Sequence, residues 1–69
     1  MSMQDPYRKL VQRVREEFVE TPGLRLTVQE ASRFWALDEA TCAAVLRELA
    51  QRGFLAQGGD RRFQMYVAA

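Results

Sequence analysis

Apolar residues recur every three or four positions over the first third of the chain. The stripe consists of Tyr7, Leu10, Val11, Val14 and Phe18. This spacing lines one face of an α-helix. Asp5 and Pro6 suit its start, because Asp caps a backbone N–H and Pro needs none at the first helical position. The segment 21–23, Thr-Pro-Gly, stops it. The pattern predicts a helix over about residues 6–20.

A second, shorter helix is predicted over about residues 28–35. Thr27 and Glu30 have the spacing of a capping box, in which each side chain satisfies a backbone N–H of the other residue. Val28, Ala31 and Trp35 form its apolar side. Phe34 and Trp35 cannot both face the core of so short a helix. We expect one of them to meet the first helix or the C-terminal hairpin, or to mark a patch that binds a partner.

The third predicted helix covers about residues 39–52. Asp38 is its expected N-cap, and Gly53 is its expected left-handed stop. The inward stripe consists of Cys42, Val45, Leu46 and Leu49. Cys42 therefore has the position of a small buried apolar residue rather than of a redox group.

The apolar period changes to two residues near the end of the chain, which is typical of a half-buried strand. Phe63, Met65 and Val67 alternate with Arg62, Gln64 and Tyr66. The Gly58-Gly59 pair before them predicts a β-hairpin over about residues 54–67. The segment 24–26, Leu-Arg-Leu, alternates in the same way and predicts a minimal strand. The expected fold class is α+β, mainly α, in one domain of three helices, a short strand and a C-terminal hairpin.

This order of elements resembles the winged helix-turn-helix family, in its small bacterial DNA-binding form. Residues 26–38 look like the family's LT-x-x-x-A-x-x-L-x-G-L-S/D entry, with Ala31 as the small residue between two helices and Leu37 as the apolar plug. Residues 41–55 are similar to its T-V-x-x-x-L-x-x-L-x-x-x-G-L-I recognition helix and exit into the wing. The resemblance covers roughly residues 24–67. Ala36 stands where glycine is common, so we expect a less sharp turn.

The resemblance implies a transcription regulator that places its third helix in the major groove and its hairpin wing on the backbone or minor groove. The expected contacts with double-stranded DNA are Thr27, Gln29, Ala40, Thr41, Ala44, Arg47, Gln51, Arg61 and Arg62. Arg47 suits a guanine edge and Gln51 an adenine or a phosphate. The alanines suit thymine methyl groups or a close approach, and Thr41 flanks this face. Arg61 and Arg62 suit phosphates or a narrow minor groove, and Thr27 and Gln29 suit phosphates.

Charge weighs against DNA binding. The net charge is only +1, and residues 38–52 sum to −1, with Asp38 and Glu39 at the end that would lead into the groove. These carboxylates also suit the helix dipole, which is a purely structural explanation. The alternative function is therefore a protein–protein interaction module or self-associating adaptor, which would dock through the alanine face of the third helix or through Trp35.

The first predicted helix carries its charges in two blocks. Its first part is basic, with Arg8, Lys9, Arg13 and Arg15, and its end is acidic, with Glu16, Glu17 and Glu20. This order opposes the helix dipole. One interpretation is a solvated face. The other is a homodimer in which two such helices pack antiparallel, basic half against acidic half.

Composition excludes several classes. The 69 residues include no histidine and one cysteine, so a catalytic zinc site, a Cys-His or Ser-His-Asp nucleophile and an internal disulfide all lack their parts. We expect no enzyme activity, no cofactor and no metal. The N-terminus lacks a signal-peptide pattern, and no apolar run approaches the about 18 residues that a membrane span needs. The expected location is the cytoplasm.

Overall fold

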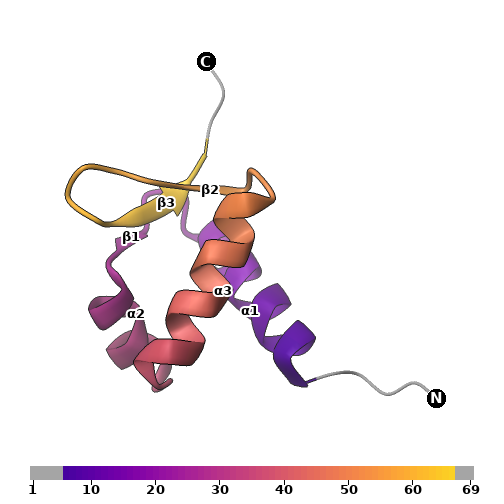
Figure 1. The fold of residues 1–69 in the computed structure, drawn as a ribbon. Coiled ribbons are helices and arrows are strands. Elements are labelled where there is room, and N and C mark those ends of the chain that lie inside the picture. Colours follow the sequence, from indigo (N-terminus) through magenta and orange to yellow (C-terminus); the bar gives the residue numbers. More distant parts are fainter. Residues whose placement is uncertain (1–5, 67–69) are drawn as a thin grey trace.

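Three helices and one small antiparallel sheet make up residues 6–66, the part of the chain that this computed structural model describes (Figure 1). In chain order the elements are α1 (Pro6–Glu20), β1 (Arg25–Leu26), α2 (Val28–Trp35), α3 (Glu39–Gln51), β2 (Leu55–Gln57) and β3 (Phe63–Met65). The α+β class, its mainly helical content and the order of elements are as predicted. Asp5 and Val67, predicted as a helix cap and as the last hairpin residue, lie outside the described residues.

The two predicted side-chain caps that lie within the described residues are present. The backbone N–H of Glu30 donates to Thr27 Oγ1 at 3.1 Å, and the backbone N–H of Thr27 donates to Glu30 Oε1 at 3.0 Å. At the start of α3, the backbone N–H of Thr41 donates to Asp38 Oδ2 at 2.9 Å. These bonds satisfy backbone donors that have no partner within a helix, so the sequence fixes where α2 and α3 begin.

The turn between α2 and α3 corrects one expectation. Ala36 has φ +56° and ψ +47°, which is the left-handed conformation that glycine usually supplies. The next residue, Leu37, donates its backbone N–H to the Ser32 carbonyl at 2.9 Å and packs half-buried against the core. The turn therefore keeps the left-handed residue without glycine. For an L-residue this conformation costs about 1–2 kcal/mol.

Helix α3 ends at Gln51, one residue earlier than predicted. Arg52 is the C-cap, with φ −82° and ψ 0°. Gly53 follows with φ +81°, as its predicted role as a stop requires. A left-handed residue directly after the C-cap turns the chain away from the helix axis, and here it leads the chain into β2.

Strand β3 is the centre of the sheet, in the order β1-β3-β2 with both pairs antiparallel. Leu26 lies opposite Phe63 on one side of β3, and Gln57 lies opposite Phe63 on the other. The predicted minimal strand over 24–26 therefore exists over its last two residues, and it pairs with the C-terminal hairpin. In Figure 1 the sheet lies against one end of the three helices, and its hairpin loop extends to the side of α2.

The core joins all three helices to the sheet. Its buried residues are Val11, Val14, Phe18, Ala31, Cys42, Val45, Leu46, Leu49, Leu55 and Phe63. All but Leu55 belong to the predicted apolar stripes. Trp35 is half-buried and meets α1, with its ring 6.1 Å from that of Phe18, whereas Phe34 is 57% exposed. No helix within residues 6–66 is long and apolar enough to cross a membrane.

Candidate nucleic-acid interface

The outward face of α3 is the one predicted. Ala40, Ala44, Arg47 and Gln51 are all exposed, while the opposite stripe of the helix is buried. These positions are three or four residues apart, so they form one continuous strip along the helix. The side chains of the two alanines are short, so another molecule can approach α3 closely near its start.

A hollow lies beside this strip, between the start of α2, the middle of α3 and the hairpin loop. Its polar lining consists of Thr27, Gln29, Arg47, Gln57, Asp60 and Arg61, and we call it the arginine hollow. Four of the predicted contact residues thus meet in one place, although they come from three separate parts of the chain. Ala40, Thr41, Ala44 and Gln51 do not line the hollow.

Arg61 occupies an unusual backbone conformation in the hairpin loop. Its φ is +67°, whereas neither Gly58 nor Gly59 has a positive φ. The Arg61 backbone N–H donates to the Gly58 carbonyl, and the Gly58 N–H donates to the Arg62 carbonyl, each at 3.0 Å. This is the pattern of a three-residue hairpin loop whose last residue is left-handed, a position that favours glycine. The predicted turn is confirmed, but an arginine rather than a glycine takes the left-handed position.

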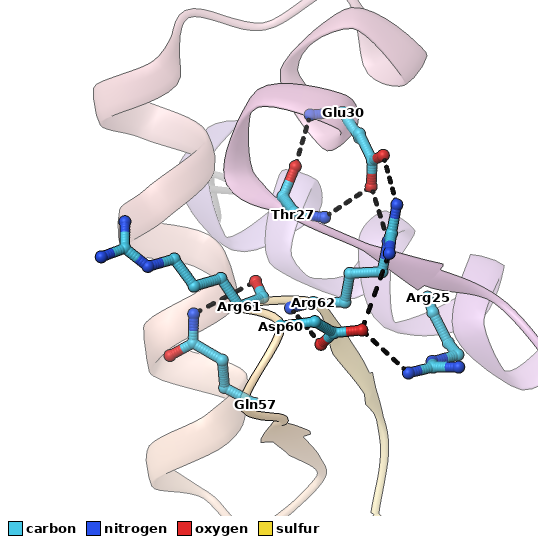
Figure 2. A network of polar contacts seen from close by, with 7 residues as sticks. All are labelled: Arg25, Thr27, Glu30, Gln57, Asp60, Arg61 and Arg62. Carbon is cyan, nitrogen blue, oxygen red and sulfur yellow. Dashed lines mark hydrogen bonds and ion pairs between the residues drawn. The ribbon is translucent and has the colours of Figure 1, made fainter.

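The Arg61 side chain points away from the polar cluster formed by its neighbours, as Figure 2 shows. Within residues 6–66, neither Arg47 nor Arg61 forms an ion pair with a carboxylate. The positive charge of both guanidinium groups in the arginine hollow is therefore uncompensated by a direct partner.

Arg62 has different surroundings from Arg61. Its Nε donates to Glu30 Oε1 at 3.2 Å and its Nη2 donates to Glu30 Oε2 at 2.9 Å (Figure 2). This two-bond geometry matches a planar guanidinium to a carboxylate. The bond from Arg62, followed by the backbone bond from Thr27, lowers the pKa of Glu30 to about 2. The predicted DNA contact of Arg62 stays a prediction, while its observed bonds join the hairpin to α2.

Asp60 extends this cluster to β1. Its Oδ1 accepts the backbone N–H of Arg62 at 3.1 Å, and its Oδ2 accepts from Arg25 at 3.0 Å. The backbone bond from Arg62 is the main reason that the pKa of Asp60 lies below its usual range. Arg62 Nη1 also lies 3.6 Å from Asp60 Oδ2, so the charges alternate from Glu30 through Arg62 and Asp60 to Arg25. This network links the hairpin loop to β1 and to the start of α2.

Thr41 and Asp38 are bound to each other at the start of α3. The Thr41 hydroxyl donates to Asp38 Oδ1 at 2.8 Å, in addition to the backbone bond of the cap. The backbone bond is also the main cause that holds the pKa of Asp38 below its usual value. The carboxylate that opposes phosphate binding thus has a structural role as the cap of α3.

Sequence reasoning missed Gln57. It is exposed, lines the arginine hollow and donates from Nε2 to the Arg61 carbonyl at 3.2 Å. The signal was present, because Gln57 is the last residue before the loop glycines and its side chain must lie beside the loop.

Comparison with family models, with characterised proteins and with solved structures gave no match to this chain.

Proposed function

We propose that this protein is a winged helix-turn-helix DNA-binding protein that acts as a transcription regulator. In this proposal α3 enters the major groove and the β2–β3 hairpin is the wing. One observation carries it: Arg47 of α3 and Arg61 of the hairpin line the same hollow, and both lack a carboxylate partner within residues 6–66. Neutralising phosphates with such groups is the main source of affinity for DNA.

The exposed strip of α3 supplies the surface for base contacts. Its alanines allow the helix axis to approach the base edges, and Arg47 and Gln51 extend from the same face. An arginine pairs with the two acceptors of guanine, and a glutamine pairs with the donor and acceptor of adenine. Gln29 and the half-buried Thr27, at the start of α2, add phosphate contacts from the far side of the arginine hollow.

The acidic start of α3 limits affinity in this proposal. Asp38 and Glu39 lie one helical turn or less from Ala40, so a duplex on the strip passes near both carboxylates. Their repulsion of phosphate favours weak binding to random sequences. A regulator of this kind then depends on correct base contacts for its affinity.

Reversing the charge of one arginine on α3, with a control on α1, tests the proposal. We expect Arg47→Glu to weaken binding to a short duplex by at least about tenfold, because it removes the guanine contact and places a carboxylate near the phosphates. Arg13→Glu is the matched control, since Arg13 is also exposed, belongs to α1 and does not line the arginine hollow. Equal binding by wild type and Arg47→Glu would reject the proposal.

A protein–protein interaction module is the second candidate. It is favoured by the exposed alanines of α3 together with the exposed ring of Phe34 on α2. Ala44→Arg separates the two functions. On the module reading the long side chain blocks association of the alanine face with a partner or a second copy, whereas in DNA binding it adds a positive charge and maintains or raises affinity.

A further inference from the structure

A second groove lies on another side of the molecule, between α1 and the end of α3. It is lined by Arg8, Gln12, Arg15, Glu48, Arg52 and Phe54, above the buried side chains of Val11 and Leu49. We call it the α1–α3 groove. Arg47 on α3 and its C-cap Arg52 are five residues apart, which places their side chains about 140° apart around the helix, and the two linings share no residue. The groove is therefore distinct from the arginine hollow, and the DNA-binding proposal makes no use of it.

The groove carries more positive than negative charge. Three arginines line it against one carboxylate, that of Glu48. Arg52 donates to Glu48 Oε2 at 2.6 Å, so these two charges are paired with each other. Within residues 6–66 no carboxylate forms an ion pair with Arg8 or Arg15. The guanidinium groups of Arg8 and Arg15 therefore remain on the same edge of the groove. These residues are seven positions apart on α1, which is about two helical turns.

Arg15 is held in place by an aromatic ring. Its guanidinium carbon lies 4.8 Å from the centre of the Phe54 ring, in a cation–π contact. A guanidinium above a ring can still donate from the N–H groups at its edge to a carboxylate that lies in the guanidinium plane. Phe54 itself is half-buried and packs against the core. The groove thus presents guanidinium donors beside an aromatic ring.

We propose that the α1–α3 groove binds an acidic linear segment of a partner protein, in which carboxylates flank an apolar or aromatic side chain. Charge complementarity with Arg8 and Arg15 selects the carboxylates. The apolar side chain packs at Phe54. A DNA backbone matches this groove less well, because its phosphates offer no apolar group to the ring. The inference adds a partner site to the protein and does not depend on DNA binding.

A labelled peptide tests this site directly. The probe is a fluorescein-labelled peptide in which glutamates flank a single tryptophan, and its counterpart has glutamine at every glutamate. We expect the acidic peptide to bind wild type with salt-sensitive affinity, and Arg8→Glu/Arg15→Glu to weaken it by at least about tenfold. Lys9→Glu/Arg13→Glu is the matched control. It makes the same change in net charge on exposed positions of the same helix outside the groove, and it should retain most of the affinity.

A measurement on wild type avoids any effect of substitution on folding. The side-chain Nε–Hε signals of Arg8 and Arg15 should shift in NMR spectra as the acidic peptide is added, while that of Arg61 should not. Absence of peptide binding, equal binding by the glutamine peptide, or equal loss in both double variants would overturn the proposal. Loss of duplex DNA binding in Arg8→Glu/Arg15→Glu without peptide binding would also overturn it, and would assign the groove to phosphate instead.

Discussion

The guanidinium of Arg62 donates two hydrogen bonds to the carboxylate of Glu30, which lies 32 positions earlier in the sequence. The preceding residue, Arg61, points the other way, into the arginine hollow. Two adjacent arginines in the hairpin therefore have separate roles: one holds the hairpin on α2, and the other remains available to a ligand. This division is the basis of the first two predictions.

Acid should weaken the link between the hairpin and α2. The pKa of Glu30 is about 2 in the folded chain, against 4.5 for the free group. A carboxyl whose pKa is depressed by folding stabilises the fold above its unfolded pKa. This contribution is lost as the pH falls from the unfolded pKa to the folded pKa. We expect carboxyl-detected NMR to show Glu30 titrating near pH 2.

Glu30→Gln provides the comparison, because its side-chain oxygen can still accept the backbone N–H of Thr27 while the charge is gone. In thermal unfolding experiments, this variant should lose less stability than wild type when the pH is lowered from about 5 to about 2. A Glu30 titration near its ordinary value in wild type would show that the Arg62 bond is absent in solution.

Arg61→Gly should stabilise the fold and weaken DNA binding together. Glycine has no steric penalty at a φ of +67°, so we expect a gain of about 1 kcal/mol in the free energy of unfolding. The same change removes one of the two unpaired guanidinium groups of the arginine hollow. Urea denaturation and duplex binding, measured on one protein sample, check both effects. Strain retained at a contact residue is expected where function requires that side chain.

Arg61→Ala is the control for this pair of effects. It removes the guanidinium but keeps the left-handed strain, so it should weaken DNA binding without the gain in stability. Lower stability in Arg61→Gly than in Arg61→Ala would contradict the left-handed conformation.

Ala36→Gly should also raise stability, by about 1 kcal/mol, because it relieves the left-handed backbone between α2 and α3. In a chain of this size that corresponds to a rise in Tm of about 4–8 °C. Ala44→Gly is the matched control. Ala44 is exposed in the middle of α3, where glycine should instead lower stability by about 1 kcal/mol. The two substitutions should shift Tm in opposite directions, and a fall in both would be inconsistent with the turn geometry.

The thiol of Cys42 should be inert in the native protein. Cys42 is 1% exposed, and burial is the main cause that raises its pKa, with the carboxylates of Asp38 and Glu39 adding to it. Because the thiolate is the reactive form, we expect slow reaction with a disulfide reagent in buffer and rapid reaction in urea. Rapid reaction in buffer would show that the α3 side of the core opens readily.

The elements were predictable because each has a local cause in the sequence. The capping pair Thr27 and Glu30, the cap at Asp38 and the stop at Gly53 set boundaries within one residue of those observed. The two left-handed residues other than glycine were not predictable in the same way. Glycine is the residue type that most easily adopts a positive φ, whereas here Ala36 and Arg61 occupy these positions. The bonds and packing around each turn outweigh this local preference.

The candidate site was predictable only in part. Helical periodicity placed Arg47 and Gln51 on the exposed strip of α3, but no local pattern indicates that Arg62 reaches Glu30 rather than solvent. That contact depends on how the hairpin lies over α2, which is a long-range property. The α1–α3 groove escaped prediction for the same reason, since Arg15 and Phe54 meet only after the helices pack.

The most direct test of the central claim is the salt dependence of binding to a short duplex, measured by fluorescence anisotropy. Wild type is compared with Arg47→Ala/Arg61→Ala and with Arg13→Ala. Each phosphate contact contributes about one unit to the slope of log affinity against log salt concentration. We predict that the double variant binds more weakly and that its slope falls by about one unit, because Arg61 is the phosphate contact of the pair and Arg47 is the base contact, while Arg13→Ala matches wild type. Absence of wild-type binding at low salt, or an unchanged slope in the double variant, would contradict the account.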